Sequence, residues 1–414
     1  MAISGKTGAI DQQDERFVPA SGFRGWVGDI VSRVSAGELG SIPVVVGLVV
    51  IWITFQILNP TFLSSTNLVN LTMQCAAVGT MAIGIVLVLL IGEIDLSVGS
   101  VSGLASAILA VAFVQNGLPL VVAILLAIAA GAVAGLIFGL LRTAFGVPSF
   151  VITLAGLLGF LGVQLYVLGA RGSINIPFES VIVQFAQQWF LPDWASYLVV
   201  ALAVLVYAGQ NLSLASRRTS AGLTSLSRPT ILVRSAIMLV LLGLSAWYLN
   251  LSRGVGAMFL LFLLLVVVAD YFLTRTGWGR AVHAIGGNVE AARRAGIRVD
   301  RIYISVFMIC STLAAVGGIL AAARLGAANQ SSGGTDTSLN AIAAAVIGGT
   351  SLFGGRGSAF SAVLGILVIM SITSGLALLN LDSSIRYMIT GVVLVLAVVI
   401  DALSRRSRAA AGRA

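Results

Sequence analysis

The chain has 414 residues, of which 9% are charged and 58% are hydrophobic, and its mean hydropathy is +1.05. A soluble domain carries about 25% charged residues, so this composition excludes a soluble globular fold and leaves the lipid bilayer as the solvent for most of the chain. The net charge of +9 does not indicate nucleic-acid binding, because the basic residues stand at the ends of apolar segments.

Residues 1–41 are polar and mixed in charge, and we expect them to form a cytoplasmic arm. The first apolar run begins at Ile42, which is too late for the apolar core of a signal peptide, so no cleavable signal is expected. The segment Phe23–Val34 fits either a helix on the membrane surface or a disordered tail, and both interpretations stay open. A second cytoplasmic segment, the tail 403–414, is expected at the other end.

Twelve apolar segments lie between the arm and the tail. Each is expected to be a membrane-spanning helix, because backbone polar groups in lipid must bond within the chain. A β-barrel would show alternation in segments of about ten residues, whereas these runs are continuous. The sequence therefore predicts an all-α, polytopic helical membrane protein with a transmembrane domain over 42–402. The expected spans are 42–58, 73–92, 97–114, 118–141, 147–169, 195–208, 230–249, 254–273, 302–323, 337–352, 359–379 and 385–402, of which 195–208 and 337–352 are short.

The basic residues predict how these spans are oriented. With the N-terminus inside, nineteen of the 24 Lys and Arg residues fall in inner segments and three fall in outer loops. This bias predicts that both termini and the loop 274–301 are cytoplasmic, and that the loops 170–194 and 324–336 are external. The three outer arginines are Arg171, Arg253 and Arg324.

Catalytic and metal-binding patterns are missing from the sequence. The P-loop pattern GxxxxGK[ST] is absent, because the single lysine, Lys6, has no glycine at the required earlier position. His283 is the only histidine, and Cys75 and Cys310 stand in separate apolar spans, so no metal site and no cofactor are expected. The chain is therefore not expected to be an enzyme. Energy for transport must come from a partner ATPase or from an ion gradient.

The segment 92–100, GlyGluIleAspLeuSerValGlySer, places two carboxylates between the second and third spans. Charges at membrane depth are costly and usually functional. Asp95 is expected to cap the N-terminus of the following helix. Two interpretations stay open, a tight cytoplasmic turn with solvated acids or a broken helix that lines the translocation path. For the second, the expected path residues are Gln74, Glu93, Asp95, Ser97 and Ser100.

The loop 274–301 contains Glu290-Ala291-Ala292, followed by Gly296. Small residues after a glutamate, and then a glycine, predict a short helix with a flat face that ends at a glycine C-cap. Because a long arginine-rich loop is unusual in so apolar a chain, a docking element is favoured over a generic inner loop.

The segment 348–358 is rich in glycine and separates two apolar runs. Glycines permit turns with positive φ and close approach of backbones. A loop that cradles phosphate is one interpretation, but no helix-opening lysine follows. A tight inner turn is therefore favoured.

Taken together, these three segments resemble those of the permease family of monosaccharide ABC importers. The matching motifs are GEIDLSVGS at 92–100, AIGGN-x-EAAR-x-AGI at 284–297 and AIAA-x-VIGGTSLxGGxG at 341–357. The resemblance covers 42–402. Ribose-type permeases are expected to have ten spans, whereas this chain has an extra pair near 195–250, and it is therefore more similar to D-xylose permeases.

The resemblance implies a permease homodimer in the bacterial inner membrane, with cytoplasmic ABC ATPase subunits, a periplasmic sugar-binding protein and a monosaccharide substrate. The residues it assigns to ATPase docking are Glu290, Ala291, Ala292, Arg293 and Gly296. The Leu-Pro that ends this signature in other importers is absent after Gly296, so the match is to the sugar-permease variant. The alternative class is an ion-coupled secondary transporter, in which Glu93, Asp95 or Asp270 would hold the coupling ion.

Overall fold

The computed structural model describes residues 42–382 apart from Thr224, together with scattered positions between 384 and 399. The expected arm (1–41), the tail (403–414) and most of the expected span 385–402 lie outside the described residues. The described chain forms two units, which are taken separately below: the segment Leu191–Val255, and a larger unit that contains the residues before and after it.

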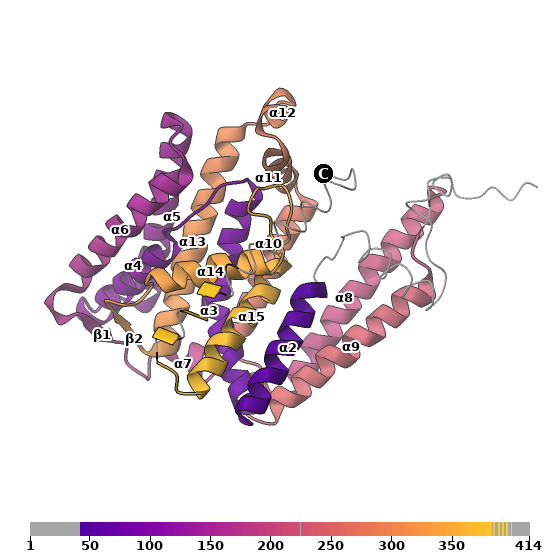
Figure 1. Ribbon diagram of the computed structural model, residues 1–414, viewed down its shortest axis with the longest axis horizontal. Coiled ribbons are helices and arrows are strands. Elements are labelled where there is room, and N and C mark those ends of the chain that lie inside the picture. The colour runs from indigo at the N-terminus through magenta and orange to yellow at the C-terminus, as the bar shows by residue number, and fades with distance from the viewer. Residues whose placement is uncertain are drawn as a thin grey trace, which may run out of the picture. The chain divides into compact units, whose positions relative to one another are not determined.

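The larger unit is built almost entirely of helices (Figure 1). Its helices are α2 (Ile42–Leu58), α3 (Ser65–Leu90), α4 (Val98–Ala110), α5 (Leu120–Phe145), α6 (Ser149–Leu168), α7 (Val181–Gln187), α10 (Ala257–Arg275), α11 (Gly277–Gly287), α12 (Val289–Arg294), α13 (Val299–Leu325), α14 (Thr335–Ile347) and α15 (Phe360–Leu378). A π-helical turn, Val111–Gln115, extends α4, and a 3-10 turn, Gly169–Arg171, follows α6. Two short strands, β1 (Ser173–Asn175) and β2 (Ala327–Asn329), pair antiparallel.

Across both units, nine helices of the described residues are long and apolar enough to cross a membrane, and α2 is a shorter apolar helix. The predicted all-α, polytopic architecture is confirmed. Its helices follow from the continuous apolar runs, whose backbone groups bond within each segment.

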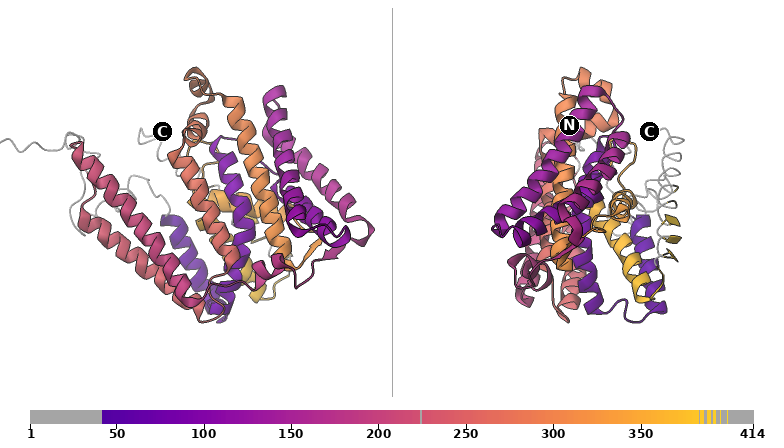
Figure 2. Two further views of the ribbon diagram at one scale, coloured as in Figure 1. Left: turned by 180° about the vertical axis from the view of Figure 1, so that it is seen from behind. Right: turned by 90° about the vertical axis from the view of Figure 1, so that its left-hand side faces the viewer.

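Helix α13 is the centre of the larger unit and packs against α3, α4 and α5. With 27 residues it is about 40 Å long. Its N-terminal end adjoins α12 and its C-terminal end adjoins β2 (Figures 1 and 2). The loop expected inside and the loop expected outside therefore lie at opposite ends of one membrane-length helix.

Small residues allow α5 to lie directly against α13. Gly131, Gly135 and Gly139 recur every four residues on α5, so they share one face of the helix. A methyl group at Gly131 would lie 2.6 Å from the Ala315 side chain, and one at Gly135 would overlap the Phe307 carbonyl oxygen. Because lipid is as apolar as the side chains, such close backbone approach supplies much of the packing energy between membrane helices.

The segment Leu191–Val255 is a hairpin of two long helices, α8 (Asp193–Ser220) and α9 (Arg228–Asn250), which pack against each other. The short span predicted at 195–208 is wrong in length, because α8 has 28 residues and is about 42 Å long. The apolar run ends near residue 208, but the helix continues through a polar stretch that bilayer hydropathy cannot detect. Helix α9 begins where the Ser227 hydroxyl accepts from the Thr230 amide at 3.4 Å.

The expectation of a full span at 337–352 is also wrong. Helix α14 has 13 residues and is about 20 Å long, which is shorter than the roughly 30 Å hydrocarbon core. Gly349, Gly354 and Gly355 follow it with positive φ, so the helix cannot continue. The Gly355 amide donates to the Leu90 carbonyl at 2.9 Å, which brings this glycine-rich loop to the end of α3. A half-helix and a loop thus replace the expected helix.

We predict that Gly135→Ala lowers the thermal unfolding midpoint of the detergent-solubilised protein, because the added methyl group separates α5 from α13. The control is Gly159→Ala on α6, where a methyl group meets nothing within 4 Å. Both changes raise helix propensity by about 1 kcal/mol, so the control should be neutral or stabilising. Equal midpoints for the two variants would refute the packing argument.

Candidate functional site

The predicted docking helix is present as α12, a short helix fixed at both ends. At its start, the Asn288 side-chain oxygen accepts from the Ala291 amide at 2.9 Å. At its end, Gly296 has φ +81°, and the Ile297 amide donates back to the Ala292 carbonyl at 3.1 Å. This is the Schellman arrangement, and the predicted glycine C-cap is confirmed.

The predicted docking residues form an exposed surface on this helix. Only Ala292 is buried, at 4% exposure, and it belongs to the core. Glu290 and Arg293 are both exposed and form an ion pair at 2.8 Å, which contributes little stability in water. Ala291 and Gly296 are exposed as well, and a methyl group at Gly296 would meet nothing within 4 Å. These four residues are therefore accessible on the surface of the described chain.

The last turn of α11 anchors α12 to the rest of the larger unit. Residues 286–296, which contain this turn and α12, are called the docking segment below, after the role predicted for them. A methyl group at Gly286 would overlap both the Leu90 carbonyl oxygen and the Gly355 amide nitrogen. Only glycine allows α11, the end of α3 and the loop 348–358 to meet at one point. Because the Gly355 amide already donates to Leu90, this loop does not present it to a phosphate.

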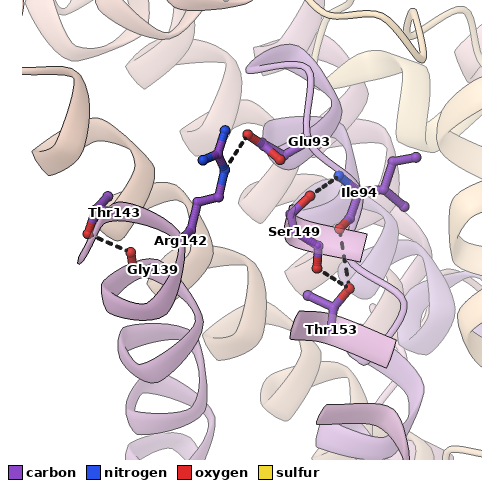
Figure 3. A network of polar contacts seen from close by, with 7 residues as sticks. All are labelled: Glu93, Ile94, Gly139, Arg142, Thr143, Ser149 and Thr153. Atoms are coloured by element: carbon purple, nitrogen blue, oxygen red, sulfur yellow. Dashed lines mark hydrogen bonds and ion pairs between the residues drawn. The ribbon is translucent and has the colours of Figure 1, made fainter. Parts of the chain in front are cut away.

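The stretch 92–97 is an interruption between α3 and α4 without regular structure. Hydroxyl groups of α6 satisfy its backbone (Figure 3). The Ser149 hydroxyl accepts from the Ile94 amide at 3.2 Å, and the Thr153 hydroxyl accepts from the Leu96 amide at 3.1 Å. An irregular backbone is tolerated at membrane depth only when protein groups replace the missing helical hydrogen bonds.

Asp95 is 1% exposed and holds the turn that leads into α4. Its Oδ1 accepts from the Ser97 amide at 2.8 Å and from the Ser97 hydroxyl at 2.6 Å, and the Cys310 thiol lies 3.6 Å from Oδ2. The predicted N-cap role of Asp95 is wrong, since Ser97 is the N-cap and Asp95 precedes it by two residues. Burial raises the pKa of the Asp95 carboxyl, and the hydrogen bonds lower it in part.

Glu93 is also withdrawn from solvent, at 9% exposure. The Arg142 Nε at the end of α5 donates to its Oε1 at 2.8 Å (Figure 3). The same guanidinium lies over the ring of Tyr303 on α13, 5.2 Å from the centroid. The interpretation of 92–100 as a turn with solvated acids is therefore wrong.

A cavity of about 300 Å³ lies among α3, α4, α13, α14 and α15, beside the loop that follows β2. Of the five expected path residues, Gln74 lines this cavity, and Glu93, Asp95, Ser97 and Ser100 do not. The place of all five on the translocation path stays a prediction.

Arg324, Asp336 and Asn340 also line the cavity, and sequence reasoning had not selected them. Arg324 was expected in an outer loop, but α13 continues to Leu325 and carries it in its last turn. Its Nε is buried and has no hydrogen-bond partner within the part of the chain that the structure describes. The polarity of 324–336 was the only signal in the sequence, and it does not distinguish a cavity wall from a solvated loop.

The loop that borders the cavity is held from two sides. Gln164 on α6 is fully buried, and its side-chain amide donates to the carbonyls of Asn329 at 3.1 Å and Ser332 at 2.9 Å. On the other side, β1 pairs with β2 in a register that places Ile174 opposite Ala328. The cavity wall is thus fixed by the outer segment that was predicted at 170–194.

A family model described as "Branched-chain amino acid transport system / permease component" matches residues 67–398. The xylose transport system permease protein of Escherichia coli (strain K12) is 36% identical over 345 residues, which are 83% of this chain and 87% of that protein. Its counterpart in Haemophilus influenzae is 35% identical over 83% of this chain and 91% of that protein. The ribose import permease protein of Bacillus subtilis (strain 168) is 32% identical over 86% of this chain and 90% of that protein. No solved structure matches.

We predict that Asp95→Ala destabilises the protein by about 2 kcal/mol, because the buried amide and hydroxyl of Ser97 lose their acceptor. Asp95→Asn keeps a side-chain oxygen and should lose less. Thermal unfolding in detergent measures both variants, with Glu179→Ala at an exposed acid of the outer segment as control. An Asp95→Ala midpoint equal to that of the control would contradict the assigned role.

Proposed function

Since the chain belongs to the family of branched-chain amino acid transport system permease components, we propose that it is the membrane permease of an ATP-binding cassette importer. The proposed substrate is a monosaccharide, and D-xylose is the proposed sugar because relatives over most of the chain are named xylose permeases. In this role the chain provides the translocation path and hydrolyses no nucleotide itself.

The docking segment is the observation that supports this proposal most directly. Glu290, Ala291, Arg293 and Gly296 are exposed among the described residues, while Ala292 fixes the helix to the core. A capped helix with an exposed face is suited to bind a partner protein and to transmit that partner's conformational change to the membrane helices. We assign that partner as a cytoplasmic ATPase subunit.

The proposed assembly places the protein in the bacterial inner membrane, with both termini in the cytoplasm. Two permease copies form the path, and a periplasmic sugar-binding protein delivers the sugar at the end that carries β1 and β2. The arginine bias supports this orientation, because the docking segment and most basic residues share one side.

An ion-coupled carrier is the competing class, and the geometry favours it less. A coupling carboxylate should reach the substrate path, and two of the acids named for this role in the sequence do not line the cavity: Glu93 is paired with Arg142, and Asp95 is held by Ser97. A lone carrier also has no use for an exposed docking helix.

We predict that D-xylose uptake by cells that carry the assembled system stops when ATP is depleted and survives collapse of the proton and sodium gradients. The reason is that only an importer of this class takes its energy from a bound ATPase. Uptake of labelled sugar after arsenate treatment, and separately after ionophores, measures the two cases. Uptake that follows the ion gradients would overturn the proposal.

We predict that Gly286→Ala uncouples transport whereas Gly287→Ala does not. A methyl group at Gly286 would overlap Leu90 and Gly355, but one at Gly287 meets nothing within 4 Å. The neighbouring glycine is therefore a matched control in the same helical turn. Both variants should still co-purify with the ATPase, and only Gly286→Ala should lose sugar-stimulated ATP hydrolysis by about tenfold or more. If sugar still stimulated ATP hydrolysis normally in Gly286→Ala, the contact of Gly286 with Leu90 and Gly355 would not be needed to couple ATP hydrolysis to transport.

A further inference from the structure

We propose that the cavity beside β2 is a low-affinity binding site for a neutral monosaccharide, and that Arg324 determines its specificity. This inference rests on the proposed importer function and adds the place in the fold where the sugar binds and the residue that recognises it.

The size of the cavity sets the first limit on the ligand. Its volume of about 300 Å³ is at the lower end for small-molecule sites. This volume is enough for a single sugar ring. The cavity lies entirely within the larger unit and is bordered by five of its helices.

Arg324 gives the strongest indication of a ligand. Its Nε is buried in the wall of the cavity and has no hydrogen-bond partner among the described residues. A buried polar group without a partner is rare and costly, and a cation more so. The planar guanidinium presents parallel N–H donors, and adjacent sugar hydroxyls can accept them together.

The other charge in the cavity wall argues against an anionic ligand. Asp336 lines the same cavity, and the two formal charges cancel within the described lining residues. No ion pair joins Arg324 to Asp336 in the described residues, so each is available to a ligand. A neutral ligand with both donors and acceptors satisfies both groups, because its hydroxyls donate to the carboxylate and accept from the guanidinium.

Carboxamides extend this mixed character around the cavity. Gln74 on α3 and Asn340 on α14 line it, and within the described residues no hydrogen bond engages either side chain. Each offers a donor and an acceptor, as a sugar hydroxyl does. Met81 and Met370 provide apolar surface for the C–H face of a sugar ring.

The outer side of the site is preorganised. Gln164 and the β1–β2 pairing hold the loop that contains Ser331 and Ser332, both of which line the cavity. A fixed wall reduces the entropy lost on binding. Affinity should still be low, since a deep energy well would slow release from the path.

The binding test uses the full-length permease in lipid nanodiscs with D-xylose as the probe, observed by saturation-transfer NMR. Saturable millimolar binding is expected, and Arg324→Gln should weaken it about tenfold through loss of a charge-assisted hydrogen bond. Arg171→Gln, at an exposed arginine that does not line the cavity, is the matched control and should bind as the unmodified protein does. Undiminished binding by Arg324→Gln would overturn the role of Arg324.

A gain of binding separates recognition from misfolding. Asp336→Asn removes the only negative charge of the described lining residues and leaves Arg324 unbalanced. This variant should therefore bind the anion D-xylonate, and the unmodified protein should not. Failure to gain D-xylonate would contradict the charge-balance argument. Displacement of D-xylose by L-leucine would reassign the cavity to a zwitterionic amino acid and overturn the sugar class.

These outcomes are independent of the importer proposal. If D-xylose does not bind while uptake still requires ATP and survives ionophores, the cavity inference fails and the proposed function stands. If uptake follows an ion gradient while D-xylose binds through Arg324, the proposed function fails and the site assignment stands.

Discussion

Backbone polar groups inside the bilayer must find partners within the protein, and the architecture of the larger unit depends on this constraint. Continuous helices meet it without help, but the chain interrupts its helices at 92–97 and after α14. Each interruption is supplied with partners by a neighbouring element. The hydroxyls of Ser149 and Thr153 serve the first, and the Leu90 carbonyl accepts from the second.

The interruption after α14 links the two candidate sites, which are the cavity and the docking segment, through one short helix and its loop. Helix α14 begins at the cavity, where Asp336 and Asn340 line the wall, and it leads into the glycine-rich loop that meets Gly286 under the docking segment. A half-helix of 13 residues therefore connects the proposed sugar site with the proposed ATPase site. The polar side chains of α14 line the cavity, and the glycines of the loop that follows α14 contact α11. One element can therefore take part in both proposed sites.

Three polar side chains with buried atoms illustrate how hydrogen-bond partners separate structural roles from a proposed binding role. The Asp95 Oδ1 accepts hydrogen bonds from Ser97, and the Gln164 side-chain amide donates hydrogen bonds to the loop that follows β2. Both therefore shape the protein. Arg324 is different, because its Nε is buried in the cavity wall and has no hydrogen-bond partner among the described residues. The same physical cost that requires partners for the first two indicates a ligand for the third.

The sequence by itself determined the all-α membrane architecture. Apolar runs of about 20 residues are stable in the lipid bilayer, and there a continuous helix satisfies the backbone hydrogen bonds within each run. It also determined the short helix Val289–Arg294 and its glycine end, since the Schellman cap depends on a local pattern around Gly296. It did not determine that the predicted span 337–352 is a helix too short to cross the bilayer. Hydropathy measures how apolar a segment is, and it does not show where a residue with positive φ ends the helix. Nor could it place Asp95 before the N-cap or distinguish Gln74 from Ser100 as a cavity residue. These features, and the presence of Arg324 and Asp336 in one cavity wall, depend on which helices lie together, and helix packing at long sequence separation is decided only in the tertiary structure.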